Sequence, residues 1–443
     1  MMSNQHSANI HETMAAEPQT VERRNLSILF GQGTFSTIAW TMANPSVVLT
    51  YLAISLDLPV FLAGMLVTFS QASKLFTALF GTPVAARRPK KKIDLAATDI
   101  ILAICFLLAL TAAAFGTSLI VAICFVLVIL VVGAAGEYQS IMTAGFYGDV
   151  LNSQSRMRLL YTVMTLGGIG TGSLALIAHR TFIDDAPFTR HVALVTIGVV
   201  CFLVASAVIL LVREYTKNDQ PEPATEPQRK PLKFSVGKHF HEVYGNFQVL
   251  WKMEWFRRYL RVRLALLTVE MSIPFYAILA ALSHHHTPKG MSALIISSAT
   301  ALIVSGPLWR AVGIVSTRSV MIAGASLAAF AGVLLVANYF LAIIPEPLIH
   351  AIALFIVTIA VRGVSTARSL YFMDVAPEEY RVIGIGVSKV AVRIFGIGLS
   401  FLMASVAHIQ HVIWAILILA LINAATAVLT YRTADTSDAG EAA

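Results

Sequence analysis

Three ionisable side chains stand deep inside long apolar stretches of the sequence. Glu137, Glu270 and Arg362 are each flanked on both sides by mainly apolar residues. In hydrocarbon such a group costs several kcal/mol unless it is paired or hydrated, so each is a candidate functional residue. A carboxylate there can bind and release a proton, and an arginine can hold an anion. These residues therefore favour proton and anion binding within a membrane.

Glu270 is the leading candidate for a proton carrier. It lies near the centre of the stretch 260–283, and Pro274 follows one turn later. Loss of hydration at that depth favours the neutral acid, and the proline removes a backbone hydrogen bond and loosens the helix. The alternative is a permanent ion pair with a nearby arginine such as Arg362. Glu137 is the second proton candidate.

Arg362 is the leading candidate for a substrate contact. It stands 225 residues after Glu137, and the sequence predicts that it either binds an anionic group or pairs with that carboxylate. Ser365 and Thr366 follow it at helical spacing and are further cavity candidates.

Other polar residues could line the same cavity. One stretch carries four of them, each four residues apart and hence on one helical face: Gln32, Ser36, Trp40 and Asn44. Lys389 shares a face with Arg393 and is another candidate. Arg393, Lys74 and Arg368 are interpreted instead as side chains that reach an interface or hold a carboxylate at a helix end. Basic groups outnumber carboxylates in these stretches, which favours an anionic substrate.

The overall composition indicates the environment in which these residues lie. The chain has 443 residues, of which 57% are hydrophobic and 13% charged, whereas soluble domains are about 25% charged. The net charge of +8 comes from short basic runs between apolar segments, so nucleic acid is not an expected partner and the lipid bilayer is. The three cysteines are isolated, with no zinc or disulfide spacing, so neither a metal nor a cofactor is expected.

Long apolar segments predict an all-α polytopic membrane protein, because backbone groups in lipid must bond within their own helix. A spanning helix needs about 20 apolar residues, and the sequence offers twelve such segments: 27–54, 60–80, 95–115, 118–147, 157–178, 192–213, 260–283, 290–311, 319–341, 346–372, 382–404 and 410–431. The third, sixth, ninth and twelfth carry almost no polar side chains, so they are expected to face lipid.

The charge bias of the loops predicts the orientation. Lys and Arg gather in the loops at 87–92, 156–158 and 214–259, and the opposite loops hold few. Both termini are therefore expected in the cytoplasm of a bacterium, with the spans in its inner membrane. The predicted domains are a polar tail (1–26), a first six-helix half (27–213), a cytoplasmic linker (214–259), a second six-helix half (260–431) and a tail (432–443).

The linker divides into two parts. Its first part, "NDQPEPATEPQRKP", is rich in proline and charge and predicts disorder. Its second part, 240–263, mixes tryptophans and phenylalanines with basic residues. That pattern fits an amphipathic helix on the cytoplasmic surface, or simply the beginning of the seventh span.

An internal repeat relates the two halves. Three pairs of residues share the separation of 225: Gly81 and Gly306, Asp149 and Asp374, and Arg156 and Arg381. The surrounding strings, "YGDVLNSQSR" and "YFMDVAPEEYR", each place an arginine seven residues after the aspartate. The repeat predicts duplicated halves.

With this layout the chain resembles the major facilitator superfamily from its first span to its last. The family's loop motif, Gly-x-x-x-Asp-Arg-x-Gly-Arg-Arg, corresponds here to "GTPVAARRPK" and, in the second half, to "GPLWRAVG". Gly81 and Gly306 are kept, but Ala85 and Arg310 stand where the family has its acid. The resemblance implies a central cavity lined by spans 1, 4, 7 and 10, and alternating access.

The resemblance also implies a cytoplasmic latch near the loop motif. Because its usual acid is absent, the two Asp–Arg repeats are interpreted either as a replacement latch or as solvated helix ends. The candidate latch and gating residues are Gly81, Arg87, Arg88, Asp149, Arg156, Gly306, Asp374 and Arg381. The glycines of the fifth span, which lack the proline of the family's antiporter signature, are interpreted as helix-packing positions: Gly167, Gly168, Gly170 and Gly172.

The sequence thus predicts a monomeric secondary transporter of a small solute. It contains no ATP-binding motif, so the energy is expected to come from an ion gradient, with the proton as the favoured ion, or from the substrate's own gradient. A membrane enzyme would need a grouped nucleophile or metal set such as His-Glu-x-x-His, which the sequence does not contain, so no enzymatic activity is expected. A non-transporting receptor or assembly factor of the same fold stays open, because the loop motif is degenerate and the linker carries aromatic residues.

Overall fold

Helices form nearly all of the described chain. The computed structural model of the protein describes residues 2–88, 90–151, 153–182, 186–213, 236–284, 290–313, 316–377 and 380–433. Its helices are α1 (Met2–Met42), η1 (Pro45–Leu49, a π-helix), α2 (Thr50–Ser55), α3 (Val60–Arg87), α4 (Lys91–Phe115), α5 (Ser118–Val150), α6 (Ser153–Thr181), α7 (Pro187–Ile209), α8 (Val236–Trp251), α9 (Glu254–His284), α10 (Gly290–Gly313), α11 (Thr317–Leu341), α12 (Glu346–Val375), α13 (Arg381–Ile409) and α14 (Val412–Thr433).

Twelve of these helical segments are long and apolar enough to cross a membrane. The first runs from Glu22 to Ser55 and includes the end of α1, η1 and α2. The other eleven correspond to α3–α7 and α9–α14. The predicted all-α fold with twelve spans is therefore confirmed.

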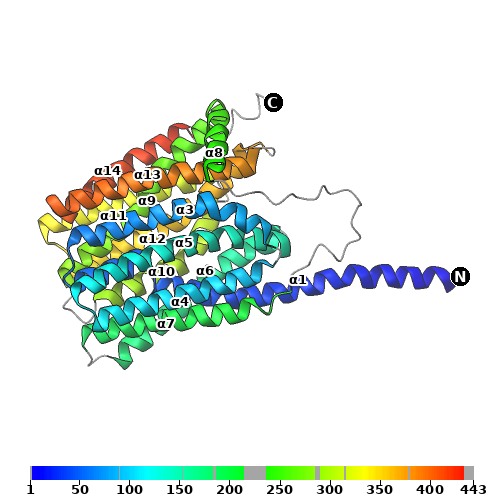
Figure 1. Ribbon diagram of the computed structural model, residues 1–443, viewed down its shortest axis with the longest axis horizontal. Coiled ribbons are helices and arrows are strands. Elements are labelled where there is room, and N and C mark those ends of the chain that lie inside the picture. The colour runs from blue at the N-terminus through cyan, green and yellow to red at the C-terminus, as the bar shows by residue number, and fades with distance from the viewer. Residues whose placement is uncertain are drawn as a thin grey trace.

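The spans form two groups that lie side by side (Figure 1). We call α1–α7, with η1, the N-terminal group and α9–α14 the C-terminal group. The groups meet mainly where α3 packs on α13 and α6 packs on α10. Small residues allow both contacts, since a Cβ on Gly64 would lie 2.8 Å from the Cβ of Ala404 and one on Gly168 would lie 2.8 Å from the carbonyl oxygen of Ala299.

The glycines of α6 serve helix packing, as predicted. Besides Gly168, which faces α10, two others face α1. A Cβ on Gly167 would lie 2.5 Å from a methyl of Thr37, and one on Gly170 would lie 2.6 Å from Ile38. The missing Cβ atoms therefore let α6 approach two neighbours at once.

The first span is broken near one end. Proline cannot donate a backbone hydrogen bond, and Pro45 begins the π-helix η1. The side chain of Asn44 caps this helix by accepting a hydrogen bond from the backbone N–H of Ser46 at 3.0 Å. The predicted single helix over 27–54 is therefore wrong in detail.

The segment after the break closes one end of the bundle. Val48, Tyr51, Leu52 and Ala53 are completely buried, and α2 packs on α9 of the other group. The apolar side chains at this end thus join the two groups.

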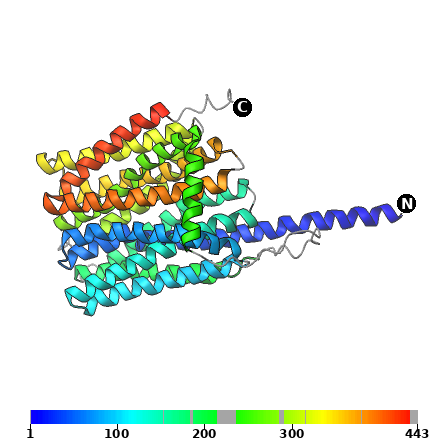
Figure 2. The same cartoon turned by 45° about the horizontal axis from the view of Figure 1, so that its top comes forward.

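Helix α8 lies across the spans rather than along them (Figure 2). It packs on α9 and α13, where Leu250 of α8, Phe256 and Val387 belong to one buried apolar cluster. A new helix, α9, begins at Glu254. Both interpretations of 240–263 are therefore partly right: its first part is a separate helix and its second part begins a span. The linker residues 214–235 lie outside the described residues.

Candidate functional site

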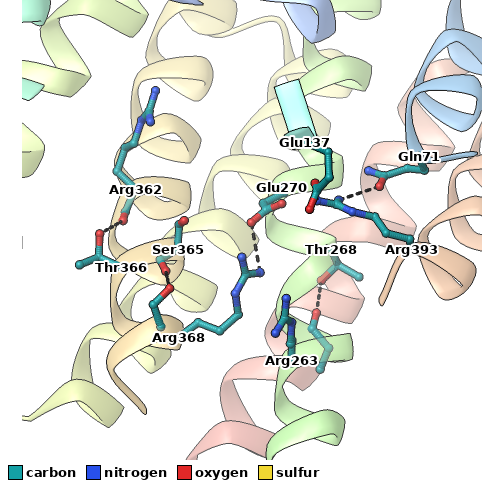
Figure 3. A network of polar contacts seen from close by, with 12 residues as sticks. Gln71, Glu137, Arg263, Thr268, Glu270, Arg362, Ser365, Thr366, Arg368 and Arg393 are labelled. Carbon is teal, nitrogen blue, oxygen red and sulfur yellow. Dashed lines mark hydrogen bonds and ion pairs between the residues drawn. The ribbon is translucent and has the colours of Figure 1, made fainter. Parts of the chain in front are cut away.

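Glu137 is the centre of a buried ion-pair cluster. It comes from α5, and its side chain is 4% exposed. Lys389 Nζ lies 3.0 Å from Oε1, and Arg393 Nη2 donates to Oε2 at 2.6 Å. The other terminal nitrogen of Arg393 donates to the side-chain oxygen of Gln71 at 2.8 Å (Figure 3). Lys389 and Arg393 are one turn apart on α13, so both reach the same carboxylate.

The cluster at Glu137 connects the two groups of helices. Glu137 and Gln71 belong to α5 and α3 of the N-terminal group, whereas both cations belong to α13 of the C-terminal group. Removal of one partner from such a buried ion pair is costly, because the other charge stays buried without compensation. We therefore regard this cluster as a clamp between the two groups of helices.

Glu270 forms a second, more open ion pair. Arg368 Nη1 lies 3.2 Å from Glu270 Oε1, and the two side chains are 16% and 30% exposed, respectively. Both residues belong to the C-terminal group, Glu270 on α9 and Arg368 on α12. Helix α9 continues without interruption past Pro274. The predicted partner, Arg362, is thus replaced by Arg368.

Arg362 is exposed and extends away from Glu270 (Figure 3). It forms no ion pair with any residue that the structure describes, and the predicted pair with Glu137 is not formed because Lys389 and Arg393 occupy that carboxylate. The hydroxyl of Thr366 donates to the backbone oxygen of Arg362 at 3.1 Å, so it is engaged within its own helix. Ser365 lies beside them on α12 and is partly buried.

Two further basic side chains, Lys74 and Arg263, lie near these carboxylates. Lys74 of α3 lies within electrostatic range of both Glu137 and Glu270. Arg263 of α9 donates to the hydroxyls of Tyr259 at 2.6 Å and Ser388 at 2.8 Å. The described network therefore contains two carboxylates and six basic side chains: Lys74, Arg263, Arg362, Arg368, Lys389 and Arg393. Its positive excess can attract and hold an anion.

Of the two interpretations of Arg368 and Arg393, the one in which they hold a carboxylate is confirmed in part. Both hold carboxylates inside the protein rather than at a helix end. The sequence contained one signal for Arg393, since it shares a helical face with Lys389. It contained none for the partner, because which helix that face meets depends on packing.

The four polar residues that were predicted to share one face of the first span lie in different environments. Gln32 is buried, whereas Ser36 is partly buried. Trp40 is partly buried and donates from its indole nitrogen to the side-chain oxygen of Gln139 at 3.1 Å. Asn44 is the cap of η1.

Two outer helices carry buried polar residues that the sequence analysis missed. Asp99 of α4, in the third span, is completely buried and accepts a hydrogen bond from the amide nitrogen of Gln139 at 2.6 Å. Asn423 of α14, in the twelfth span, is also completely buried. It accepts from the hydroxyl of Thr268 at 2.5 Å and donates to that of Ser272 at 3.2 Å. These two spans, which were expected to face lipid, thus also carry buried polar side chains that join them to neighbouring helices.

The structure describes the side chains of only some of the candidate latch residues. Gly81 and Gly306 lie where a Cβ would meet Thr77 at 2.9 Å and Thr165 at 3.1 Å, respectively, so both are packing positions. Arg156 is partly buried. The side chains of Arg87, Asp149, Asp374 and Arg381 lie outside the described part of the structure, so the latch stays a prediction.

An acid that the sequence analysis passed over lies near the first loop motif. Asp94, in the first turn of α4, is 3.4 Å from Arg88 Nε and accepts a hydrogen bond from the hydroxyl of Tyr138 at 3.5 Å. The Arg88 side chain is 56% exposed, so this contact stabilises the loop only weakly.

Comparison with known proteins identifies the family. Residues 29–400 match the profile of the Major Facilitator Superfamily. The chain belongs to this superfamily. It is an integral membrane protein, and its described residues form twelve candidate membrane spans.

Curated relatives give no substrate for this member of the superfamily. An uncharacterized protein of Mycobacterium tuberculosis is 23% identical over 326 residues, which cover 70% of this chain and 60% of the relative. An uncharacterized protein of Mycobacterium bovis matches equally well. The chain thus spans about 60% of the length of the curated relatives it matches.

Solved structures of several transporters share the fold. A mutant of the nucleoside transporter NupG has a TM-score of 0.65 at 13% identity, with 92% of this chain and 99% of that chain covered. The POT family transporter PepTSo has a TM-score of 0.64 at 12% identity, with 93% of this chain and 97% of that chain covered. The Escherichia coli xylose transporter XylE, in an inward-open conformation, has 0.63 at 12% identity, with 93% and 96% covered.

Proposed function

We propose that this protein carries a small organic anion across the membrane and couples its movement to protons. The observation that supports the anion is the excess of basic residues around Glu137 and Glu270. Such an excess is costly in a membrane interior unless an anion balances it for part of the transport cycle. One structure of similar fold is the human organic anion transporter MFSD10, with a TM-score of 0.55 at 13% identity over 92% of this chain and 99% of that chain.

The proposed substrate site lies on α12 and α9. Arg362 is exposed and unpaired among the described residues, so it is free to receive the first anionic group. Arg368 is held by Glu270, whose side chain is 30% exposed and therefore accessible to water. When Glu270 binds a proton, its attraction for Arg368 falls and the arginine becomes available to the anion. Proton and anion then favour each other's binding, which is the basis of coupling.

The proposed transport cycle moves the two groups of helices relative to each other. The closed end, where α2 packs on α9, blocks access from one side. We assign that end to the outside of a bacterial inner membrane, with both termini in the cytoplasm. To open that end, the helices must tilt where α3 packs on α13 and where α6 packs on α10. The clamp at Glu137 must then change as well. The carrier works as a monomer, since one chain supplies both groups.

A thermal-shift screen tests the substrate class. Purified protein is heated in detergent with dicarboxylates, phosphate monoesters, neutral sugars and amines of similar size, and unfolding is followed by tryptophan fluorescence. A ligand at 100 times its dissociation constant stabilises the folded state by about 2.7 kcal/mol. Stabilisation by anions alone, which disappears in Arg362→Ala, supports the proposal. Stabilisation by neutral solutes and by no anion contradicts it.

Cysteine labelling tests the orientation. Lys252 follows α8 and Gln410 follows α13, and both are exposed. In a background without the native cysteines, an impermeant thiol reagent added to sealed cells should label Gln410→Cys and spare Lys252→Cys. The opposite pattern would reverse the assignment of inside and outside.

Transport itself separates this proposal from the alternative, a non-transporting receptor or assembly factor. The feature that favours the alternative is α8, whose Tyr244 and Trp251 are exposed. Uptake or efflux of a stabilising anion in proteoliposomes would exclude it. A protein partner that co-purifies through α8, with no solute movement, would favour it.

A further inference from the structure

Asp99 is a buried acid that has no ion pair or hydrogen bond with the described charged network around Glu137 and Glu270. It lies on α4 and is completely buried. One carboxyl oxygen accepts the hydrogen bond from Gln139 at 2.6 Å, and the other has no hydrogen-bond partner among the described residues. Asp99 forms no ion pair with any of them. It differs in this from Glu137 and Glu270, whose charges are balanced by arginines.

Among the residues that the structure describes, none supplies Asp99 with a compensating cation. Helix α4 packs on α5 and α7. The titratable side chain of α5 that lies within electrostatic range is Tyr147, which is itself an acid. On α7, the hydroxyl of Ser206 donates to the backbone oxygen of Ala96, next to Asp99, and carries no charge.

The charged residues in the first turns of α4 are engaged elsewhere. Lys92 donates to the backbone oxygens of Leu210 and Val212 at the end of α7. Asp94 contacts Arg88. Lys91 packs beside Gly145 of α5. Burying an isolated carboxylate costs far more than burying the neutral acid, so these surroundings favour a carboxyl group that holds its proton.

A short hydrogen-bonded chain leads from Asp99 to a partly exposed residue, Trp40. The amide of Gln139 donates to Asp99 through its nitrogen and accepts from the indole of Trp40 through its oxygen. Trp40 belongs to α1, and it is partly exposed. Gln139 is two residues from Glu137 on α5, so the two side chains point to different faces of that helix. Helix α5 therefore carries the clamp on one face and the contact with Asp99 on another.

We propose that Asp99 is a proton-binding site of the protein, neutral in this conformation and linked through Gln139 to the partly exposed Trp40. On release, the O–H bond of the carboxylic acid breaks, the proton passes to water, and a carboxylate remains. That carboxylate has two oxygens that require donors, and the indole N–H of Trp40 is the next donor along the chain. Ionisation of Asp99 therefore draws Trp40 away from its present position.

The use of this proton in transport rests on the carrier function proposed above, whereas its binding can be measured without any substrate. Infrared difference spectra of the purified, reconstituted protein report the carbonyl stretch of protonated carboxyl groups. At neutral pH we expect a band from a buried carboxylic acid in the wild type that is missing in Asp99→Asn. The control Glu254→Gln, an exposed acid at the beginning of α9, should leave this band unchanged.

A second variant provides an independent test in case Asp99→Asn does not fold. Gln139→Met keeps the size of the side chain but removes the hydrogen bond to the carboxyl group, so the band should persist and move to higher frequency. A wild-type spectrum whose buried-acid band survives in Asp99→Asn and does not move in Gln139→Met would overturn the proposal.

Tryptophan fluorescence tests the link to Trp40. In the wild type, emission should change with pH at the same midpoint as the infrared band. Both Asp99→Asn and Trp40→Phe should lose this change. A fluorescence titration that survives unaltered in Asp99→Asn would show that Trp40 does not respond to Asp99. Because no transported solute is involved, these results stand or fall separately from the proposed anion transport.

Discussion

The carboxylates of Glu137 and Glu270 lie in the same network but in different settings. Glu137 is 4% exposed and touches two cations, whereas Glu270 is 30% exposed and touches one, Arg368. The contacts of Glu137 join α5 to α13 across the two groups, and those of Glu270 join α9 to α12 within one group. This difference agrees with the function proposed above, in which Glu137 holds the two groups together and Glu270 binds and releases protons.

The two halves have also diverged in charge. Under the predicted repeat, position 137 corresponds to position 362, so an acid in one half stands where the other half has an arginine. The two contacts between the groups keep the expected symmetry, because α3 with α13 and α10 with α6 are equivalent pairs in a duplicated fold. The helix contacts are thus compatible with duplication. The charged residues differ, since Glu137 in the first half corresponds to Arg362 in the second.

Removal of Arg393 should have the largest effect on stability. Arg393→Ala leaves Glu137 buried with a single cation and Gln71 without its donor. Loss of one partner from a buried ion pair lowers the free energy of unfolding by about 3–5 kcal/mol. Thermal and denaturant unfolding in detergent measure the change. Arg393→Lys is the matched control, since it keeps the charge and should lose much less. Equal losses in both variants would show that packing, rather than the ion pair, sets the effect.

Removal of Arg368 should have a smaller effect. Arg368→Ala leaves Glu270 unpaired, but water reaches this carboxylate and screens its charge. We expect a loss of about 1–2 kcal/mol, between the values of exposed and buried pairs. The same unfolding experiments give the ratio to Arg393→Ala. A loss as large as that of Arg393→Ala would contradict the distinction between an open pair and a clamp.

The fold was predictable from the sequence because the membrane restricts it. Runs of apolar residues long enough to cross the bilayer can only be helices, so the number of spans followed from composition. The break at Pro45 did not follow, because proline is tolerated inside a spanning helix, as Pro274 shows. Tertiary packing decides which proline interrupts a helix.

The site was predictable only one helix at a time. Glu137, Glu270 and Arg362 stood out because a charge in an apolar run is unusual, but their partners depend on how helices rotate and tilt. Asp99 was missed because it lies near the beginning of α4, where a charge is normally interfacial. It is buried because α5 and α7 cover that turn, which the sequence does not reveal.

Neutralisation of Glu270 should affect coupling more than stability. In Glu270→Gln the amide can still accept a hydrogen bond from Arg368, so we expect a loss of at most about 1 kcal/mol. For an anion found by the thermal-shift screen, accumulation driven by a pH gradient should disappear while exchange of labelled for unlabelled anion continues. Glu254→Gln on the same helix is the control. Accumulation that persists and still depends on pH would exclude Glu270 as the proton site.

Removal of Arg362 should have the smallest effect on stability. The side chain is exposed and forms no ion pair with the described residues, so Arg362→Ala should change the free energy of unfolding by no more than about 0.5 kcal/mol. Its effect on anions should be large, because Arg362, unlike the other three arginines of the network, forms no ion pair or hydrogen bond with a carboxylate or a hydroxyl among the described residues.

The contrast between folding and binding makes this prediction decisive. Arg362→Ala should unfold at the wild-type temperature without ligand and gain little or no stabilisation from the anions that protect the wild type. Arg362→Lys keeps the charge but cannot bind a carboxylate in a bidentate way, so it should recover part of the stabilisation. The double variant Arg362→Ala/Glu137→Gln distinguishes a substrate contact from a pair formed in another conformation. If Arg362 pairs with Glu137 during the cycle, the second change should restore anion movement, and if Arg362 binds the substrate, it should not. Wild-type anion protection and transport in Arg362→Ala would remove this residue from the site.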